Sequence, residues 1–223
     1  MLTLAFDVYG TLIDTRGVVI QLQHMIGEQA EQFSRCWRDK QLEYSFRRGL
    51  MQDYQPFSRC TLDALQYTDS LLGTGLSQAQ QQDLMLAYTQ LPAFTDAGPA
   101  LMALQQAGHR LYAFSNGQAD AVTKLLQQAG IHTYFEAVIS VVDVRSFKPS
   151  PDVYQHFLHR SHSHRQHTWL ISGNPFDITG ARHAGWYAAW IQRDLTVPFD
   201  PWDQQPDLTL PGLEALVTGL PKR

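Results

Sequence analysis

Several side chains that could act on one substrate are spread along the chain. They follow short apolar runs, in this order: Asp7, then Ser115 with Asn116, then Lys148, then Ser172 with Asn174 and Asp177. A carboxylate beside an ammonium group can serve as a nucleophile, and a second carboxylate can activate water. These residue types therefore indicate nucleophilic chemistry, provided that the fold brings the separate segments to one place.

The segments that must position these groups alternate between apolar runs typical of buried strands and helical patterns. We expect strands at 2–6, 110–114, 137–142, 168–171 and 187–191, and helices at 96–107, 118–129, 150–160 and 177–184. Gly108 and Gly130 suit helix C-termini, and Ser150 before Pro151 suits a helix start. The alternation predicts an α/β fold with a doubly wound, mostly parallel sheet. In such a sheet ligands bind beyond the carboxyl ends of the strands, where the candidate side chains follow.

One long segment, from 15 to 93, breaks the alternation. Its apolar spacing is helical throughout, and Leu42, Phe46 and Leu50 are spaced i, i+4 and i+8. An insertion of ~75 residues is too long for a loop. We therefore predict a helical cap at 15–93, inserted after the first strand of an α/β core made of residues 1–14 and 94–223.

The composition excludes several classes of protein. Seventeen Lys and Arg residues against 21 Asp and Glu residues give a formal charge of −4, which lacks the basic field of a nucleic-acid binder. No apolar run reaches the ~18 residues that a membrane helix needs. Cys36 and Cys60 form neither a CxxC pair nor a disulfide framework. We therefore expect a cytoplasmic protein with no nucleic-acid or membrane partner.

The motifs around the candidate groups resemble those of the haloacid dehalogenase superfamily. The resemblance is carried by Asp7-Val8-Tyr9-Gly10-Thr11-Leu12-Ile13-Asp14, Ser115-Asn116-Gly117, Lys148-Pro149 and Ser172-Gly173-Asn174-Pro175-Phe176-Asp177. Within the superfamily the sequence is most similar to the L-2-haloacid dehalogenases, whose cap motif is present as Trp37-Arg38-Asp39-Lys40-Gln41-Leu42-Glu43-Tyr44. The order and spacing of these motifs cover nearly the whole core.

What the resemblance implies is a two-step hydrolysis of a 2-haloacid that needs no metal and no cofactor. Asp7 would attack C2, displace halide and leave an ester on the enzyme, and water activated near Asp177 would cleave that ester. Because the displacement inverts C2, an L-substrate would give a D-2-hydroxy acid. Relatives of this kind are often dimers with cap helices in the contact, so the resemblance also implies a homodimer as the form to test.

The resemblance also implies roles for the remaining residues. Arg38 would accept the departing halide, and Ser115 with the backbone at Asn116 would hold the substrate carboxylate. The residues that would orient the carboxylates and the water are Thr11, Lys148, Tyr154, Ser172 and Asn174. The apolar wall would consist of Tyr9, Leu42, Phe57 and Phe176. Asp39 stands where the family often has glutamine and Phe176 where it often has tryptophan, which bears on the substrate range.

Two other functions remain open for this sequence. A Mg²⁺-dependent phosphohydrolase of the superfamily usually has a second aspartate two residues after the nucleophile, and an acid four residues before the last aspartate. Here these positions hold Tyr9 and Gly173, and the loss of a carboxylate weakens a site for a hard cation. A non-catalytic protein that binds a small acid is the other alternative, although it would need neither Asp7 nor Lys148 nor Asp177.

Each candidate residue also has an ordinary structural explanation. Asp7 could close a strand through an Asx-turn, and Arg38 could lay its stem on Leu42 and reach solvent. Ser172 and Asn174 could cap the following helix, whereas Tyr154 could belong to the core. The histidines at 156, 159, 162, 164 and 167 fit a solvated helix end better than a metal site, and we expect Trp186, Trp190 and Trp202 to pack at the sheet edge.

Overall fold

The computed structural model describes residues 1–221 of the chain. Its sheet contains six strands in the order β3-β2-β1-β4-β5-β6, and each neighbouring pair is parallel. The strands are β1 (Thr3–Phe6), β2 (Arg110–Ser115), β3 (Ala137–Ser140), β4 (Thr168–Ser172), β5 (Tyr187–Ile191) and β6 (Leu208–Leu210). Strand β1 lies between β2 and β4. The residues that follow these three strands therefore lie next to one another at the carboxyl-terminal ends of the central strands.

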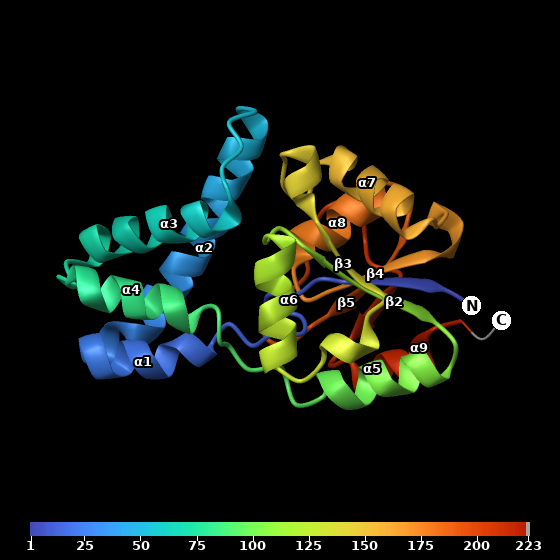
Figure 1. The fold of residues 1–223 in the computed structure, drawn as a ribbon, viewed down its shortest axis with the longest axis horizontal. Coiled ribbons are helices and arrows are strands. Elements are labelled where there is room, and N and C mark those ends of the chain that lie inside the picture. The colour runs from blue at the N-terminus through green and yellow to red at the C-terminus, as the bar shows by residue number, and fades with distance from the viewer. Residues whose placement is uncertain (222–223) are drawn as a thin grey trace.

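Helices cover both faces of the sheet (Figure 1). One face packs against α5 (Ala97–Gln106), α6 (Ala119–Gln128) and α9 (Glu214–Gly219), and the other against α7 (Pro151–Ser161) and α8 (Pro175–His183). Strand β1 supplies Leu4 and Phe6 to the first layer and Ala5 to the second, because successive side chains of a strand point to opposite faces. The predicted fold class is therefore confirmed.

The predicted core elements agree with the structure apart from a few ends and two short elements. Gly108 and Gly130 follow α5 and α6 with φ of +79° and +73°, the left-handed conformation expected after a helix. The third predicted strand is two residues too long, since Val141–Val144 forms a 3₁₀ turn. Strand β6 and helix α9 were not predicted, because three and six residues are too short for a periodic pattern.

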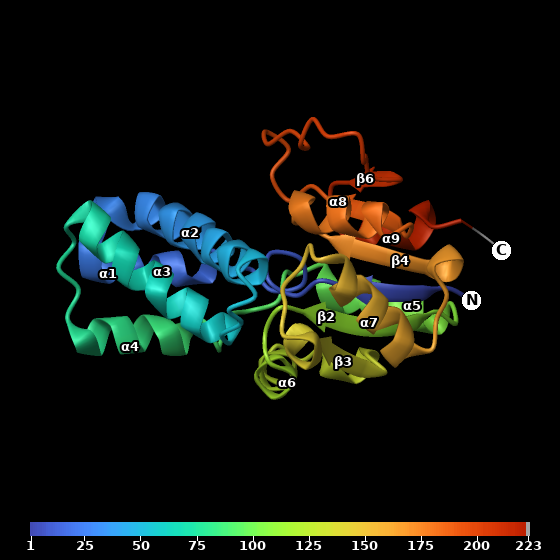
Figure 2. The same ribbon diagram turned by 90° about the horizontal axis from the view of Figure 1, so that it is seen from above.

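Residues 17–87 form a separate layer of helices beyond one end of the sheet (Figures 1 and 2). They are α1 (Gly17–Ile26), α2 (Ala30–Leu50), α3 (Phe57–Leu72) and α4 (Gln78–Ala87), with a 3₁₀ turn at Gly27–Gln29. All lie inside the insertion predicted at 15–93, whereas the division of the chain into two domains stays a prediction. Below, "the cap" means residues 15–93.

The helical spacing of Leu42, Phe46 and Leu50 agrees with α2, but these residues do not form its buried face. Leu50 is 88 % exposed, and Leu42 and Phe46 are only half-buried. The buried face instead runs through Ala30, Phe33, Trp37, Gln41 and Ser45. This face tolerates polar groups because they are hydrogen-bonded: the Gln41 amide donates to Thr61 Oγ1 at 2.6 Å, and Ser45 Oγ donates to the Leu42 carbonyl at 2.7 Å.

The two chain segments that join the cap to the core are tied together. Asp14 N donates to Pro92 O and Phe94 N donates to Leu12 O, each at 2.9 Å. Arg193, just after β5, donates from Nη2 to Thr11 O and from Nη1 to Asp96 Oδ2, both at 2.7 Å. Its guanidinium carbon also lies 3.9 Å from the centre of the Phe94 ring. Arg193 thus contacts both segments, and through Thr11 it reaches the loop that carries Asp7.

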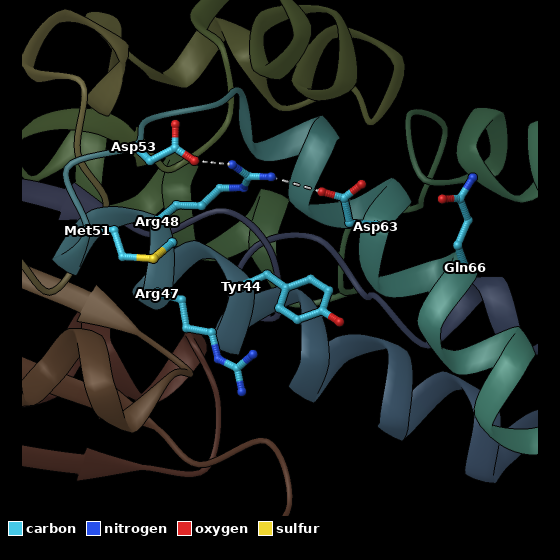
Figure 3. Close-up of a pocket in the computed structure, with 7 residues that line it drawn as sticks. All are labelled: Tyr44, Arg47, Arg48, Met51, Asp53, Asp63 and Gln66. Carbon is cyan, nitrogen blue, oxygen red and sulfur yellow. Dashed lines mark hydrogen bonds and ion pairs between the residues drawn. The ribbon is translucent and has the colours of Figure 1, made fainter.

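A polar hollow of about 400 Å³ opens on the cap between α2 and α3 (Figure 3). Arg48 lies across it and pairs with Asp53 at 2.8 Å and Asp63 at 3.1 Å. The other lining residues are Tyr44, Arg47, Met51 and Gln66. Because Arg48 is neutralised by its neighbours and no candidate residue from the sequence lines this hollow, it is separate from the site described next.

Two remaining expectations have clear outcomes. Trp186 and Trp190 are buried as expected, but Trp202 is 64 % exposed on the segment after β5, so the packing expected for it is wrong. Among residues 1–221, no helix has the length and hydropathy required to span a membrane.

Candidate active site

Asp7 lies directly after β1, and its carboxylate is held from three directions. Oδ2 accepts hydrogen bonds from Thr11 Oγ1 at 2.7 Å and from Asn174 Nδ2 at 2.8 Å. Oδ1 faces Lys148 Nζ at 3.2 Å. Gly10 allows the chain to turn back after Asp7 because its φ of +82° suits glycine. The side chain is therefore oriented by tertiary partners, and the Asx-turn explanation does not describe it.

Lys148 connects the two carboxylates of the site. Its ammonium donates to Asp7 Oδ1, to Asp177 Oδ2 at 2.7 Å and to the Phe114 carbonyl at 2.8 Å. These acceptors match the three N–H donors of an ammonium group. The side chain is 1 % exposed, and its nitrogen lies 4.2 Å from the centre of the Phe114 ring. Lys148 is thus a fully paired buried cation, not a solvated loop lysine.

Asp177 lies in the first turn of α8 and is completely buried. Besides Lys148, it binds Tyr154, whose hydroxyl donates to Oδ1 at 2.8 Å. Burial raises the pKa of the Asp177 carboxyl, while the nearby Lys148 ammonium opposes that change. Burial and the Asp177 charge together hold the pKa of the Tyr154 phenol far above its ordinary value, so Tyr154 remains a donor.

Gly180 is what allows Tyr154 to reach Asp177. A Cβ at position 180 would lie 2.3 Å from the Tyr154 hydroxyl oxygen and 2.6 Å from Pro149 Cβ. No side chain fits between α7 and α8 at this point, so the two helices approach closely enough for the hydrogen bond to form. Tyr154 is therefore a buried residue with a polar contact to the site, rather than a packing residue alone.

The ends of β2 and β4 contribute buried polar groups beside Asp7. Asn116 Oδ1 accepts from the main-chain nitrogen of Lys148 at 2.9 Å, which fastens the lysine loop to the end of β2. Ser115 Oγ accepts from Gly117 N at 3.1 Å, and Ser172 Oγ accepts from Asn174 N at 3.1 Å. The Asn174 side chain makes no capping bond to α8 and instead contacts Asp7.

Arg38 extends from α2 of the cap toward this group. Its guanidinium donates to Gln41 Oε1 at 2.7 Å, to Asn174 Oδ1 at 3.2 Å and to the Tyr9 carbonyl at 3.5 Å. All three acceptors are neutral, and within residues 1–221 Arg38 has no carboxylate partner. Asp39 is exposed and forms no ion pair in the same part of the chain. The arginine therefore has no countercharge among these contacts, and through Asn174 it is linked to Asp7.

The residues expected to form the apolar wall are only partly together. Tyr9 packs between Phe57, at 6.4 Å between ring centres, and Tyr88, at 6.0 Å. Phe176 instead packs edge-on against Phe46 of α2 at 5.1 Å. Leu42 is half-buried on the same helix. Burial raises the pKa of the Tyr9 phenol above its usual range, so this side chain stays neutral.

Four residues near the site were not singled out from the sequence. Gln41 and Tyr88 surround the Arg38 guanidinium, Arg193 holds the Thr11 carbonyl, and Phe114 offers its carbonyl to Lys148. The sequence could have indicated the contact between Gln41 and Arg38, since side chains three residues apart on one helix are neighbours. The others act through the main chain or from distant segments, where side-chain type and spacing carry no signal.

The groups around the two carboxylates do not suit a hard divalent cation. They are an ammonium, a hydroxyl and amide N–H donors, whereas Mg²⁺ prefers several oxygen ligands. A Cβ at Gly173 would lie only 2.4 Å from the Gly10 carbonyl oxygen, so an extra acid at this position requires the backbone to move. Residues 1–221 also contain no cluster of three or more His, Cys, Asp or Glu side chains arranged for a metal.

The histidines lie away from this site. His159, His162, His164 and His167 are exposed at the end of α7 and in the polar segment after it, as expected. His156 is half-buried, and its Nε2 lies 3.4 Å from Asp143 Oδ2.

Comparison with known proteins identifies the family. A family model described as haloacid dehalogenase-like hydrolase matches residues 1–185. The chain belongs to this family. Haloacetate dehalogenase H-2 of Moraxella sp. (strain B) is 35 % identical over 214 residues, which span 96 % of this chain and 95 % of that protein. The (S)-2-haloacid dehalogenase of Pseudomonas sp. (strain YL) is 34 % identical over 96 % of this chain and 92 % of its own.

A solved structure supports the same relationship. The L-2-haloacid dehalogenase from Xanthobacter autotrophicus with chloropropionic acid covalently bound superposes with a TM-score of 0.88 and 30 % identity, covering 98 % of this chain and 97 % of that one. Fold and sequence thus place this haloacid dehalogenase-like hydrolase among relatives named for the cleavage of carbon–halogen bonds.

Proposed function

We propose that the protein hydrolyses short 2-haloalkanoic acids and converts an L-2-haloacid into a D-2-hydroxy acid and halide. The observation that carries the proposal is that Asn174 binds both an oriented carboxylate, Asp7, and a cation without a carboxylate partner among the described residues, Arg38. A carboxylate nucleophile and a cation for the leaving anion are what a displacement of halide requires. The relatives named (S)-2-haloacid dehalogenase support the same reaction.

In the first step the Asp7 carboxylate attacks C2 of the substrate from the side opposite the halogen. A bond forms between the carboxylate oxygen and C2, and the carbon–halogen bond breaks with its electron pair leaving on the halide. Arg38 receives this anion through its charge. No proton is needed by the leaving group, which agrees with a neutral Tyr9 at the place where a phosphatase carries an acid.

In the second step water attacks the carbonyl carbon of the Asp7 ester, and Asp177 accepts its proton. The ester bond to the former carboxylate oxygen breaks, the alcohol oxygen receives a proton, and Asp7 is regenerated. Burial raises the pKa of Asp177 and so makes it a stronger base than an exposed aspartate. Lys148, which contacts both carboxylates, lowers the repulsion between them.

The substrate carboxylate is assigned to Ser115 and the backbone at Asn116, at the end of β2. Ser115 is 1 % exposed, and Asn116 is tied to the Lys148 loop, so this end of the strand is held in a fixed position. Thr11, Asn174 and Ser172 orient Asp7 and the loop after β4, and Tyr154 orients Asp177. These assignments are part of the proposal.

Racemic 2-chloropropionate with EDTA present provides the test. We expect release of chloride, complete conversion of the L-enantiomer alone, and D-lactate as the product in chiral chromatography. Formation of L-lactate, activity only after Mg²⁺ is added, or turnover of small phosphate esters but not of the haloacid would contradict the proposal. The Asp7→Asn variant serves as the control for non-enzymatic hydrolysis.

The proposal extends to assembly and location. A homodimer formed through the cap is supported by Tyr67 and Leu71, which are exposed on α3 and spaced i, i+4. Analytical ultracentrifugation should show a dimer that Leu71→Arg dissociates and that Leu195→Arg, at an exposed leucine of the core, leaves intact; a monomeric wild type would contradict this part. A cytoplasmic location is supported by Cys36 and Cys60, which are both free thiols.

A further inference from the structure

An apolar groove runs between α2 and the core, beside the site described above. It has a volume of about 580 Å³, and its lining includes Lys148 and Phe176 from the candidate site. Most of the remaining lining is apolar: Phe46, Gly49, Leu50, Phe147, Pro149, Pro151 and Trp202. A second hollow of about 340 Å³ continues from it and shares Pro149, Pro151, Phe176 and Trp202. The catalytic assignments above do not use this space.

The groove lies along the same face of α2 that carries Arg38. Arg38, Leu42, Ser45 and Gly49 follow one another at spacings of four, three and four residues, so they lie on successive turns of one face. At a rise of about 1.5 Å per residue, Gly49 is roughly 10 Å beyond Leu42 along the helix. A substituent that passes Leu42 while its C2 is held at Asp7 would therefore enter the groove.

The chemistry of the lining selects an apolar occupant. Aromatic rings stand on both sides, with Phe46 on the cap and Phe147, Phe176 and Trp202 on the core. Trp202 is 64 % exposed, so a ligand in the groove would remove a large apolar surface from water. Lys148 is the charged residue in the lining, and its ammonium is already paired with Asp7 and Asp177.

We propose that this groove binds the alkyl substituent at C2 of 2-haloacids much longer than chloropropionate. The inference rests on the proposed function, and it names medium-chain 2-haloalkanoic acids as a substrate class. The methyl group of 2-chloropropionate is too short to leave the catalytic end. A hexyl substituent, as in 2-chlorooctanoate, extends beyond Leu42 and contacts Phe46, Phe176 and Trp202.

A larger side chain at position 49 would fill part of the groove, and this substitution leaves the proposed catalytic residues unchanged. A Cβ at this position would lie 3.9 Å from a Phe147 ring carbon and 4.0 Å from Ser146 Oγ, which are ordinary contacts.

The experiment compares kcat/KM for L-2-chloropropionate and L-2-chlorooctanoate in the wild type, Gly49→Leu and Gly49→Ala. We expect Gly49→Leu to lose about tenfold or more on chlorooctanoate, with chloropropionate unchanged, because the longer side chain occupies the space of the substituent. Gly49→Ala adds only the Cβ and should retain both activities.

Trp202 gives a second, independent variant for the case that Gly49→Leu does not fold. Trp202→Ala should lower kcat/KM for chlorooctanoate several-fold and leave chloropropionate unchanged, and Leu195→Ala, at an exposed residue of the same segment outside the groove, should change neither. In the wild type, octanoate should also inhibit chloropropionate hydrolysis more strongly than propionate does.

The outcomes separate the two proposals. Turnover of chloropropionate without turnover of chlorooctanoate, or a chain-length preference that neither Gly49→Leu nor Trp202→Ala alters, would overturn the groove assignment and leave the dehalogenase function standing. Absence of turnover of both haloacids would overturn both.

Discussion

The core part and the cap part of the candidate site are held in different ways. On the core side, Asp7, Lys148 and Asp177 are buried; Lys148 contacts both carboxylates, Thr11 donates to Asp7 and Tyr154 donates to Asp177. On the cap side, Arg38 projects from a single helix and meets only neutral acceptors. The core thus keeps the reacting groups in a fixed, charge-paired arrangement, whereas the cap offers a cation that is ready for an incoming or departing anion.

The difference suggests a division of work between the two parts. Rigid surroundings keep a nucleophile and a base in their reactive orientation. Fewer groups then have to reorient during the reaction. We propose that substrate range, in contrast, depends on the α2 face that carries Arg38, Leu42 and the groove residues, which lies outside the ion pairs of the core. Each of the following predictions tests this division.

Asp7→Asn should have the largest effect, because it removes the proposed nucleophile. We expect steady-state kcat with L-2-chloropropionate to fall by roughly 10⁴-fold or more, as for the loss of a nucleophile elsewhere. Chloride release measured with a halide electrode gives the rate, and circular dichroism checks the fold. Activity close to the wild type would remove Asp7 from its assigned role.

Asp177→Asn should separate the two steps. Ester formation needs Asp7 and Arg38, whereas cleavage of the ester needs the Asp177 base, so we expect kcat to fall by about 10²–10⁴-fold while the ester accumulates. Intact-protein mass spectrometry during turnover should show the added mass of the 1-carboxyethyl group that chloropropionate leaves on Asp7. An unmodified mass during turnover would contradict the assignment.

Arg38→Ala should impair the departure of halide by about 10²-fold, since it removes a preoriented charge from the place where the anion develops. Arg38→Lys keeps the positive charge but loses the planar, two-pronged guanidinium. Its rate should therefore lie between those of the wild type and Arg38→Ala. Single-turnover halide release is the direct measurement. A cap that only covered the site would leave this rate unchanged.

Substitution of Arg193 shows whether its contacts with the segments that join cap and core affect the position of Asp7. Arg193→Gln removes the ion pair to Asp96 and weakens the bond to the Thr11 carbonyl, so we expect a loss of about 1–3 kcal/mol of stability. We also expect kcat to fall about tenfold, with KM little changed, because a small misplacement of Thr11 disturbs Asp7.

Thermal unfolding and steady-state kinetics measure the two effects. Arg193→Lys should restore part of kcat, and a fall in stability with unchanged kcat would indicate a purely structural role.

The smallest effect concerns pH. In the proposed mechanism ester cleavage requires ionised Asp177. Since burial raises the pKa of this carboxyl, the rate should fall as the pH drops through a value above that of an ordinary aspartate. Single-turnover ester cleavage followed across the acidic range provides the profile. A decline that begins only at or below the ordinary pKa of aspartate would show that the Lys148 ammonium outweighs burial.

The core part of the candidate site was largely predictable from the sequence. Apolar runs that alternate with helical patterns predict parallel strands, and Asp7, Lys148 and Asp177 follow such runs or begin the next helix. Parallel strands place their carboxyl ends at one edge, so residues far apart in the chain meet there. The cap side was less predictable: the stripe of Leu42, Phe46 and Leu50 has helical spacing, but spacing does not tell which neighbour a helix face meets.

The order of elements, the fold class and the nature of the reacting groups follow from the sequence alone, because they depend on local periodicity and residue type. The contact of Arg193 with Thr11, the exposure of Trp202 and the groove beside Gly49 emerged only in the folded chain. These features depend on the distances between segments that are remote in sequence, and packing of the whole molecule determines those distances.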